Sequence, residues 1–212
     1  SMVNLEYLTA RGMAMAALLI DSDCGCAQLT LAAISSSNKN WGSQKEKLKG
    51  IDYLNLSAEE KTWHGFLMSS SEDRPAAIKS GLTKHPNSPL INYLATSPTD
   101  MKTFSTFAGK FPEQAASSYN MMSYGYLRGD FGNVDQEMAM NYVKQSQNLH
   151  NGPNAYDSMA EHYASLGDYE KALELELKAV DFAAFGSPYW NYARVYYSKV
   201  NQTDLSKELM KS

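Results

Sequence analysis

Residues 156–179 read YDSMAEHYASLGDYEKALELELKA, and their first half carries a regular pattern of apolar side chains. Tyr156, Met159, Ala160 and Tyr163 stand at positions i, i+3, i+4 and i+7 of this stretch. Residues at this spacing lie on one face of an α-helix. The pattern therefore predicts a helix whose buried stripe carries two aromatic rings, one long apolar side chain and one small side chain.

A turn and a second helix are expected to follow directly. Gly167 suits the left-handed residue that ends a helix, and Asp168 suits the cap of the next one. Between Tyr169 and Val180, apolar residues continue at a largely helical spacing, with acidic and basic residues among them. The whole stretch is thus predicted to form a hairpin of two antiparallel helices.

The aromatic pattern occurs three times, beginning at Tyr119, Tyr156 and Tyr189. A small residue stands at the same place in each copy, where it lets a neighbouring helix approach closely. These small residues are Ser123, Ala160 and Ala193. Self-similarity at about the length of one helical hairpin is the mark of a repeat architecture, in which each hairpin buries its apolar face on the next.

The best-defined hairpin resembles a tetratricopeptide repeat (TPR), a helix-turn-helix unit of about 34 residues. The resemblance is carried by Tyr156, Met159, Ala160, Tyr163, Gly167, Asp168, Tyr169, Ala172 and Ala179. It implies an all-α fold, namely a right-handed α-solenoid of antiparallel helix pairs (a TPR-like superhelix), over a single domain of residues 1–212. The clearer repeats are expected at about 117–150, 154–186 and 187–212, and divergent repeats at about 3–116.

One residue departs from the family pattern. TPR proteins usually have a large apolar residue where this chain has Glu176. We expect the flanking Leu175 and Leu177 to take over the packing at this position.

Upstream of the clear repeats, Leu5, Leu8, Met15 and Leu19 predict a first helix that is buried along their stripe. Helix boundaries are indicated by capping-box patterns and by prolines. The boundary signals are Ser43-x-x-Glu46 and Ser57-x-x-Glu60 at helix starts, Arg74-Pro75 at a further start, and His85-Pro86 at an end. Five or six hairpins are therefore expected in the chain.

Composition excludes several classes of function. The formal net charge is −4 and the pI is about 5.6, whereas a nucleic-acid partner requires concentrated Lys and Arg. The apolar run Met13–Ile20 has about eight residues, far fewer than the ~20 that span a bilayer. We therefore expect neither a nucleic-acid partner nor a membrane-spanning segment.

The compartment is left open by the sequence. Cys24 and Cys26 are poorly spaced to pair with each other, so no disulfide framework reports an oxidising compartment. Ser1-Met2 looks like a remnant of recombinant expression, so an export signal is not readable here. The resemblance favours the periplasm or cell envelope slightly over the cytoplasm.

The sequence predicts no catalytic, cofactor or metal site. The four histidines, His64, His85, His150 and His162, are dispersed, and none has the spacing that puts two ligands on one helix face. Cys24-x-Cys26 is a soft-metal alternative that needs further ligands from elsewhere in the fold. Glu161 and His162 are neighbours in sequence, but adjacent residues point about 100° apart on a helix, which argues against a catalytic dyad.

The resemblance implies that the first helices of the hairpins line a concave groove that binds a partner. By position, the groove residues are Asn120, Tyr124, Asp157, Glu161, Trp190, Arg194 and Tyr197. Aromatic residues and Arg dominate binding energetics at interfaces. The alternative for Trp190 and Tyr197 is packing against a neighbouring helix or the chain end.

These observations predict a non-catalytic scaffold that binds a protein or peptide segment in its groove. The main alternative is a subunit of a cell-envelope system that binds a small molecule or glycan fragment by stacking sugar rings on aromatic side chains. A structural or self-assembling role, with the chain as a homo-oligomer, is the third hypothesis.

Overall fold

The structure, a computed structural model, describes residues 6–34, 46–182 and 191–192. Throughout these residues the regular structure is helical, with a single isolated bridge between Ser97 and Asp100. The predicted all-α fold is confirmed. None of the helices in the described ranges combines the length and apolarity that crossing a bilayer requires.

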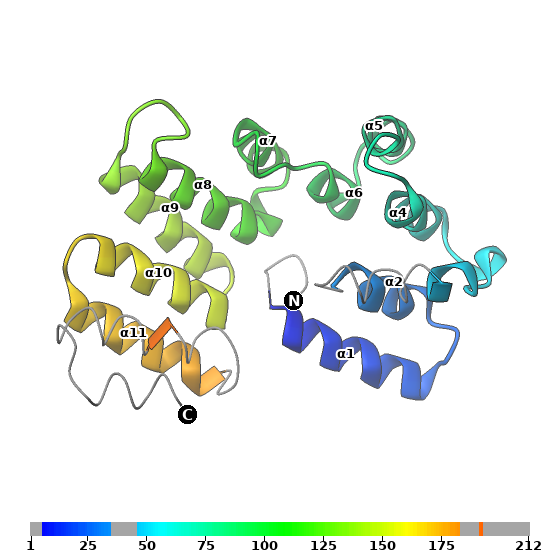
Figure 1. Cartoon of the computed structure of the whole chain (residues 1–212), viewed down its shortest axis with the longest axis horizontal. Helices are drawn as coiled ribbons and strands as arrows, with labels where there is room; N and C mark the ends of the chain where they lie inside the picture. Colours follow the sequence, from blue (N-terminus) through cyan, green and yellow to red (C-terminus); the bar gives the residue numbers. More distant parts are fainter. Residues whose placement is uncertain (1–5, 35–45, 183–190, 193–212) are drawn as a thin grey trace. The chain divides into compact units, whose positions relative to one another are not determined.

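Contacts divide the chain into two compact units. Unit 1 comprises Ser1–Thr96 and unit 2 comprises Ser97–Ser212. Figure 1 shows unit 1 in blue to cyan-green and unit 2 in green to orange.

The elements of unit 1 are mostly short helices. They are α1 (Tyr7–Ile20), α2 (Gly25–Ala33), the 3-10 turn η2 (Tyr53–Asn55), α4 (Ala58–Met68), α5 (Arg74–Lys84) and α6 (Pro89–Leu94). In sequence order, α1 packs on α2, α2 on α4, α4 on α5 and α5 on α6. Most helix contacts in this unit are therefore between helices that follow one another in the sequence.

Helix boundaries in unit 1 follow the local signals. The Ser57 hydroxyl accepts a hydrogen bond from the Glu60 backbone N–H, and the Glu60 carboxylate accepts one from the Ser57 N–H, which confirms the capping box. Helix α5 begins at Arg74 with Pro75 in its first turn, and it ends at Lys84 with His85 as its C-cap residue. Ser43 lies outside the described residues.

Helix α1 exists where it was predicted, but its buried face is a different one. Leu8, Met15 and Leu19 are exposed, Leu19 to 89%, so the prediction that they form the buried stripe is wrong; Leu5 lies outside the described residues. Instead, Ala10 and Ala14 are buried. Two small side chains one turn apart allow close approach of α2, which the larger residues would prevent.

The core of unit 1 is assembled by α2, α4 and α6. Leu29, Trp63 and Ile91 are buried within it. Gly81 lets α5 approach α4, since a Cβ at this position would lie 2.6 Å from Cζ of Phe66. The absence of a side chain at Gly81 therefore determines how closely α4 and α5 can approach each other.

Unit 2 consists of successive helices that pack in pairs. They are α7 (Lys102–Lys110), the 3-10 turn η3 (Pro112–Gln114), α8 (Ala116–Arg128), α9 (Gln136–Leu149), α10 (Pro153–Ser165) and α11 (Tyr169–Phe182). The pairs α8–α9 and α10–α11 form the two most extensive helix contacts in unit 2, and α9 packs on α10 (Figure 1). Residues 191–192 are helical and belong to the third predicted repeat.

The turn of the second hairpin has the predicted chemistry. Gly167 has φ +80°, in the left-handed region that favours glycine, and the Asp168 carboxylate accepts a hydrogen bond from the Lys171 N–H at 3.1 Å. In the first hairpin, Gly129 at φ +83° ends α8, and Asp135 caps α9. Both hairpins thus use glycine to stop one helix and aspartate to start the next.

The repeated aromatic pattern packs as expected in the described copies. The small residues Ser123 and Ala160 are fully buried. In the first copy, Tyr126 stacks on Tyr142 of α9 with ring centroids 5.4 Å apart. In the second copy, Met159 and Ala160 share a core cluster with other residues of α9 and α11.

Glu176 keeps the place that the family pattern gives to an apolar residue. Its side chain is fully buried, and Leu175 is buried beside it, whereas Leu177 is half exposed. The expectation that Leu177 takes over the packing is therefore wrong. Ala172, Leu175, Glu176 and Ala179 share one helix face, so rotating α11 to bury Leu177 would expose the alanines that contact its neighbours.

Candidate functional site

The predicted groove residues of the two described repeats lie on α8 and α10, the first helices of successive hairpins. Helices α8 and α10 contact each other directly. We call the surface formed by Asn120, Tyr124, Asp157 and Glu161 the α8–α10 face. Trp190, Arg194 and Tyr197 lie outside the described residues, so their part of the predicted groove stays a prediction.

Two of these residues join the helices. The Tyr124 hydroxyl donates a hydrogen bond of 2.5 Å to Oε2 of Glu161, which lies 37 residues later in the chain. Burial raises the pKa of Tyr124, and the neighbouring Glu161 carboxylate raises it further. Tyr124 therefore remains a protonated donor over the physiological pH range.

A histidine lies behind this hydrogen bond. The rings of Tyr124 and His162 lie 5.1 Å apart between centroids, and His162 is buried. Its Nδ1 is 2.7 Å from the carbonyl oxygen of Ser158, which accepts, so Nδ1 carries the hydrogen. Burial lowers the pKa of His162.

Helices α8 and α10 both carry buried polar side chains. Ser118, Ser123, Ser158 and Asn120 are all buried. The Ser123 hydroxyl donates to the Asn120 carbonyl oxygen at 2.7 Å, whereas Oδ1 of Asn120 and Oγ of Ser118 have no hydrogen-bond partner among the described residues. Such atoms carry a desolvation cost unless water or a bound group satisfies them.

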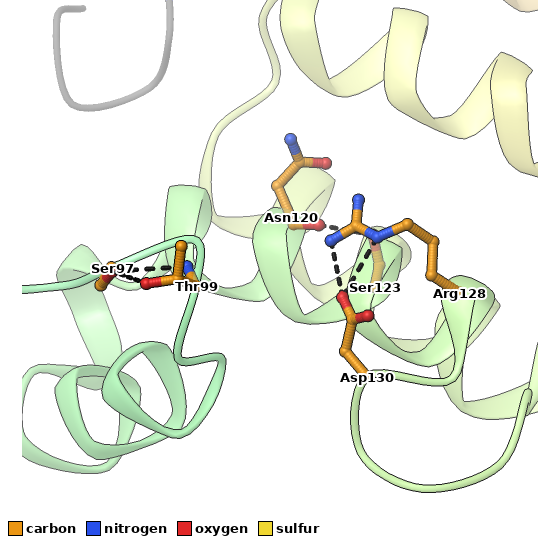
Figure 2. A network of polar contacts seen from close by, with 6 residues as sticks. All are labelled: Ser97, Thr99, Asn120, Ser123, Arg128 and Asp130. Atoms are coloured by element: carbon orange, nitrogen blue, oxygen red, sulfur yellow. Dashed lines mark hydrogen bonds and ion pairs between the residues drawn. The ribbon is translucent and has the colours of Figure 1, made fainter.

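Asn120 is the least accessible member of the α8–α10 face. It is only 2% exposed. Figure 2 shows its amide pointing away from the ion pair that Arg128 and Asp130 form at the end of α8. Its side chain is therefore buried, and Tyr124, Asp157 and Glu161 form the partly exposed portion of the face.

Asp157 connects α10 to the next predicted repeat. Nδ2 of Asn191 donates a hydrogen bond of 2.5 Å to Oδ1 of Asp157. The bond between Tyr124 and Glu161 joins α8 to α10 in the same way. Side-chain hydrogen bonds thus link the first helices of the two described hairpins, and link α10 to Asn191 of the third predicted repeat. The spacings of 37 and 34 residues are each about one TPR length.

The charge of the face is negative. Asp157 and Glu161 are carboxylates one helical turn apart, and Asn120 and Tyr124 are uncharged polar residues. The face is therefore suited to accept hydrogen bonds from a positively charged donor.

The cysteines are both free, Cys26 being exposed and Cys24 half-buried. Within the part of the chain that the structure describes, no group of three or more His, Cys, Asp or Glu side chains is arranged to hold a metal. No further ligand for Cys24 and Cys26 is therefore found in those residues.

The hydrogen bond between Tyr124 and Glu161 was not anticipated, although the sequence carried a usable signal. Both residues stand five positions after the first tyrosine of their repeat, at Tyr119 and Tyr156. Equivalent positions in stacked repeats face each other, so a donor at one and an acceptor at the next indicate a contact. The sequence contained no comparable indication that His162 is buried, because its burial depends on how closely α8 and α10 pack.

No protein-family profile matches the sequence, and no curated protein matches it.

Proposed function

We propose that this protein is a non-catalytic interaction module, a right-handed TPR-like α-solenoid that binds a protein or peptide segment along the first helices of its repeats. The supporting observation is the hydrogen bond between Tyr124 and Glu161. It holds equivalent positions of α8 and α10 next to each other, so that the repeats present a continuous face. The binding role itself is proposed by analogy with TPR proteins, which the hairpins resemble.

The chemistry of the α8–α10 face favours a basic segment as the partner. Asp157 and Glu161 contribute negative charge one turn apart on α10, and Tyr124 adds an aromatic ring beside them. Arg and Lys are the side chains that pair with carboxylates through charge-assisted hydrogen bonds. An extended or helical peptide with Lys or Arg at matching spacing would therefore be recognised.

The test is selection from a random peptide library on the whole protein, followed by affinity measurements on the selected peptides. We expect enrichment of Lys and Arg. The double substitution Asp157→Asn and Glu161→Gln removes both charges with little change of shape. It should weaken binding at least about fivefold, as expected for loss of partly exposed charge pairs.

The matched control is the double substitution Glu170→Gln and Asp181→Asn. Both of its residues are exposed on α11, the second helix of the same hairpin, so the net charge changes equally. Peptides without a basic preference, or equal weakening in both double variants, would contradict the proposal.

A further inference from the structure

Unit 1 contains a pocket that is separate from the α8–α10 face. Its volume is about 240 Å³. It is lined by Ala33, Trp63, Phe66, Leu67, Arg74, Ile78 and Leu94. These residues come from α2, α4, α5 and α6, so four helices of the unit contribute to one cavity.

The lining is apolar except at two places. Trp63 and Phe66 are buried, and Ala33, Leu67, Ile78 and Leu94 are partly buried and pack against the core of the unit. A cavity of about 150 Å³ with such a lining stays dry and accommodates benzene. The volume here therefore suits an apolar group larger than a benzene ring.

The first polar group is the indole N–H of Trp63. The residue is only 2% exposed, and its Nε1 has no hydrogen-bond partner within the part of the chain that the structure describes. Buried Trp N–H groups usually find an acceptor, because an unsatisfied donor costs free energy. This N–H has almost no accessible surface, so Arg74 supplies the polar group that a ligand in the pocket can reach.

The second polar group is the guanidinium of Arg74, which lies in the first turn of α5 and is exposed. No ion pair or side-chain hydrogen bond of Arg74 is formed among the described residues. The preceding Asp73 accepts a hydrogen bond from the Ser70 hydroxyl and does not line the pocket. Arg74 is thus a cation positioned beside an apolar cavity.

We propose that this pocket binds a small carboxylic acid with an apolar body. The apolar body fills the space among Phe66, Ile78 and Leu94, and the carboxylate pairs with Arg74. The guanidinium of Arg74 is a donor only, so it selects a ligand that accepts hydrogen bonds. A sugar is disfavoured, because its many hydroxyl donors would meet no acceptor side chain in this lining.

The probe is octanoate, an eight-carbon carboxylate, with 1-octanol as its uncharged counterpart. Binding to the full chain is measured by calorimetry and by the rise in Tm with ligand concentration. We expect saturable binding of octanoate at millimolar or lower concentration, and weaker binding of octanol. Absence of saturable octanoate binding would overturn the proposal.

Arg74→Gln tests the charge contact at an exposed position, where the substitution leaves the fold intact. It should weaken octanoate binding at least about fivefold while leaving octanol binding unchanged, as expected for loss of one charge-assisted hydrogen bond. Lys79→Gln is the matched control, because Lys79 is exposed on the same helix and does not line the pocket. Equal effects of the two substitutions would overturn the assignment of Arg74.

Ala33→Leu tests the location by filling part of the cavity. It should weaken the binding of both octanoate and octanol, and unchanged binding in a folded variant would show that the ligand lies elsewhere. If this variant does not fold, the comparison of Arg74→Gln with Lys79→Gln decides the proposal. None of these substitutions lies on the α8–α10 face. The proposal of peptide binding and the proposal of octanoate binding are therefore tested independently.

Discussion

Tyr124 and Glu161 show how single residues determine the contact between repeats. A short hydrogen bond from a hydroxyl to a carboxylate joins α8 to α10 in a region where neighbouring serines and Asn120 are buried. Hydrogen bonds to charged acceptors contribute more than neutral ones, and the contribution falls with exposure to water.

We expect Tyr124→Phe to lower the free energy of unfolding by about 1 kcal/mol, because Glu161 loses a hydrogen-bond donor while the ring remains. Urea unfolding of the whole chain measures the change. Tyr156→Phe is the matched control, since its ring stacks on Phe182 and its hydroxyl makes no hydrogen bond in the described structure. Equal urea midpoints for the two variants would contradict the assigned role of Tyr124.

His162 makes the stability of unit 2 depend on pH. Its pKa is lowered in the folded state, chiefly by burial, so between that value and the unfolded value of about 6.5 the unfolded chain binds more protons. Stability is therefore fully present above pH 6.5 and falls as the pH is lowered below it. Glu161 opposes this shift, since its negative charge favours the protonated imidazole.

We expect the urea midpoint of the wild type to decrease when the pH is lowered from 7.5 to 5.5. His162→Gln should make this decrease smaller. The His162→Gln variant is expected to be less stable than the wild type already at pH 7.5. The quantity compared is therefore the change in urea midpoint between the two pH values, taken within each protein. His150→Gln, at the end of α9 in the same unit, is the matched control and should keep the wild-type fall. A His162→Gln variant with an undiminished fall would assign the pH dependence to other groups.

At the scale of elements, the starts and ends of helices could be predicted from neighbouring residues. Ser57 with Glu60, and Gly167 with Asp168, act through hydrogen bonds and backbone angles within one turn of the chain. The buried face of α1 was predicted wrongly, because its sequence offers apolar residues on several faces. The tertiary contact with α2 selected the alanines, which permit the closest approach.

The orientation of α1 predicts the response to substitution. Leu19→Lys should change the free energy of unfolding by no more than about 0.5 kcal/mol, since this side chain is largely exposed and a lysine near a helix C-terminus is favourable. Leu29→Ala, in the core of the same unit, should cost about 2–5 kcal/mol. Urea unfolding compares the two, and a Leu19→Lys cost in the range of Leu29→Ala would show that Leu19 is covered.

At the scale of the whole molecule, the contacts group the helices into two compact units. Unit 2 holds the two described copies of the aromatic repeat, and unit 1 holds the pocket beside Arg74. The continuous solenoid over residues 1–212 and the groove formed with Trp190, Arg194 and Tyr197 stay predictions. Peptide binding and carboxylate binding would then reside in different units.

The sequence by itself determined the all-helical character, the hairpin turns and the repeat of Tyr119 and Tyr156, because these depend on spacing and on interactions within a few residues. Only the tertiary structure decided that Tyr124 bonds to Glu161, that His162 is buried, and that α2, α4, α5 and α6 enclose a cavity. Those features depend on distances between helices far apart in the chain. Such distances are set by the packing of all contacting side chains together.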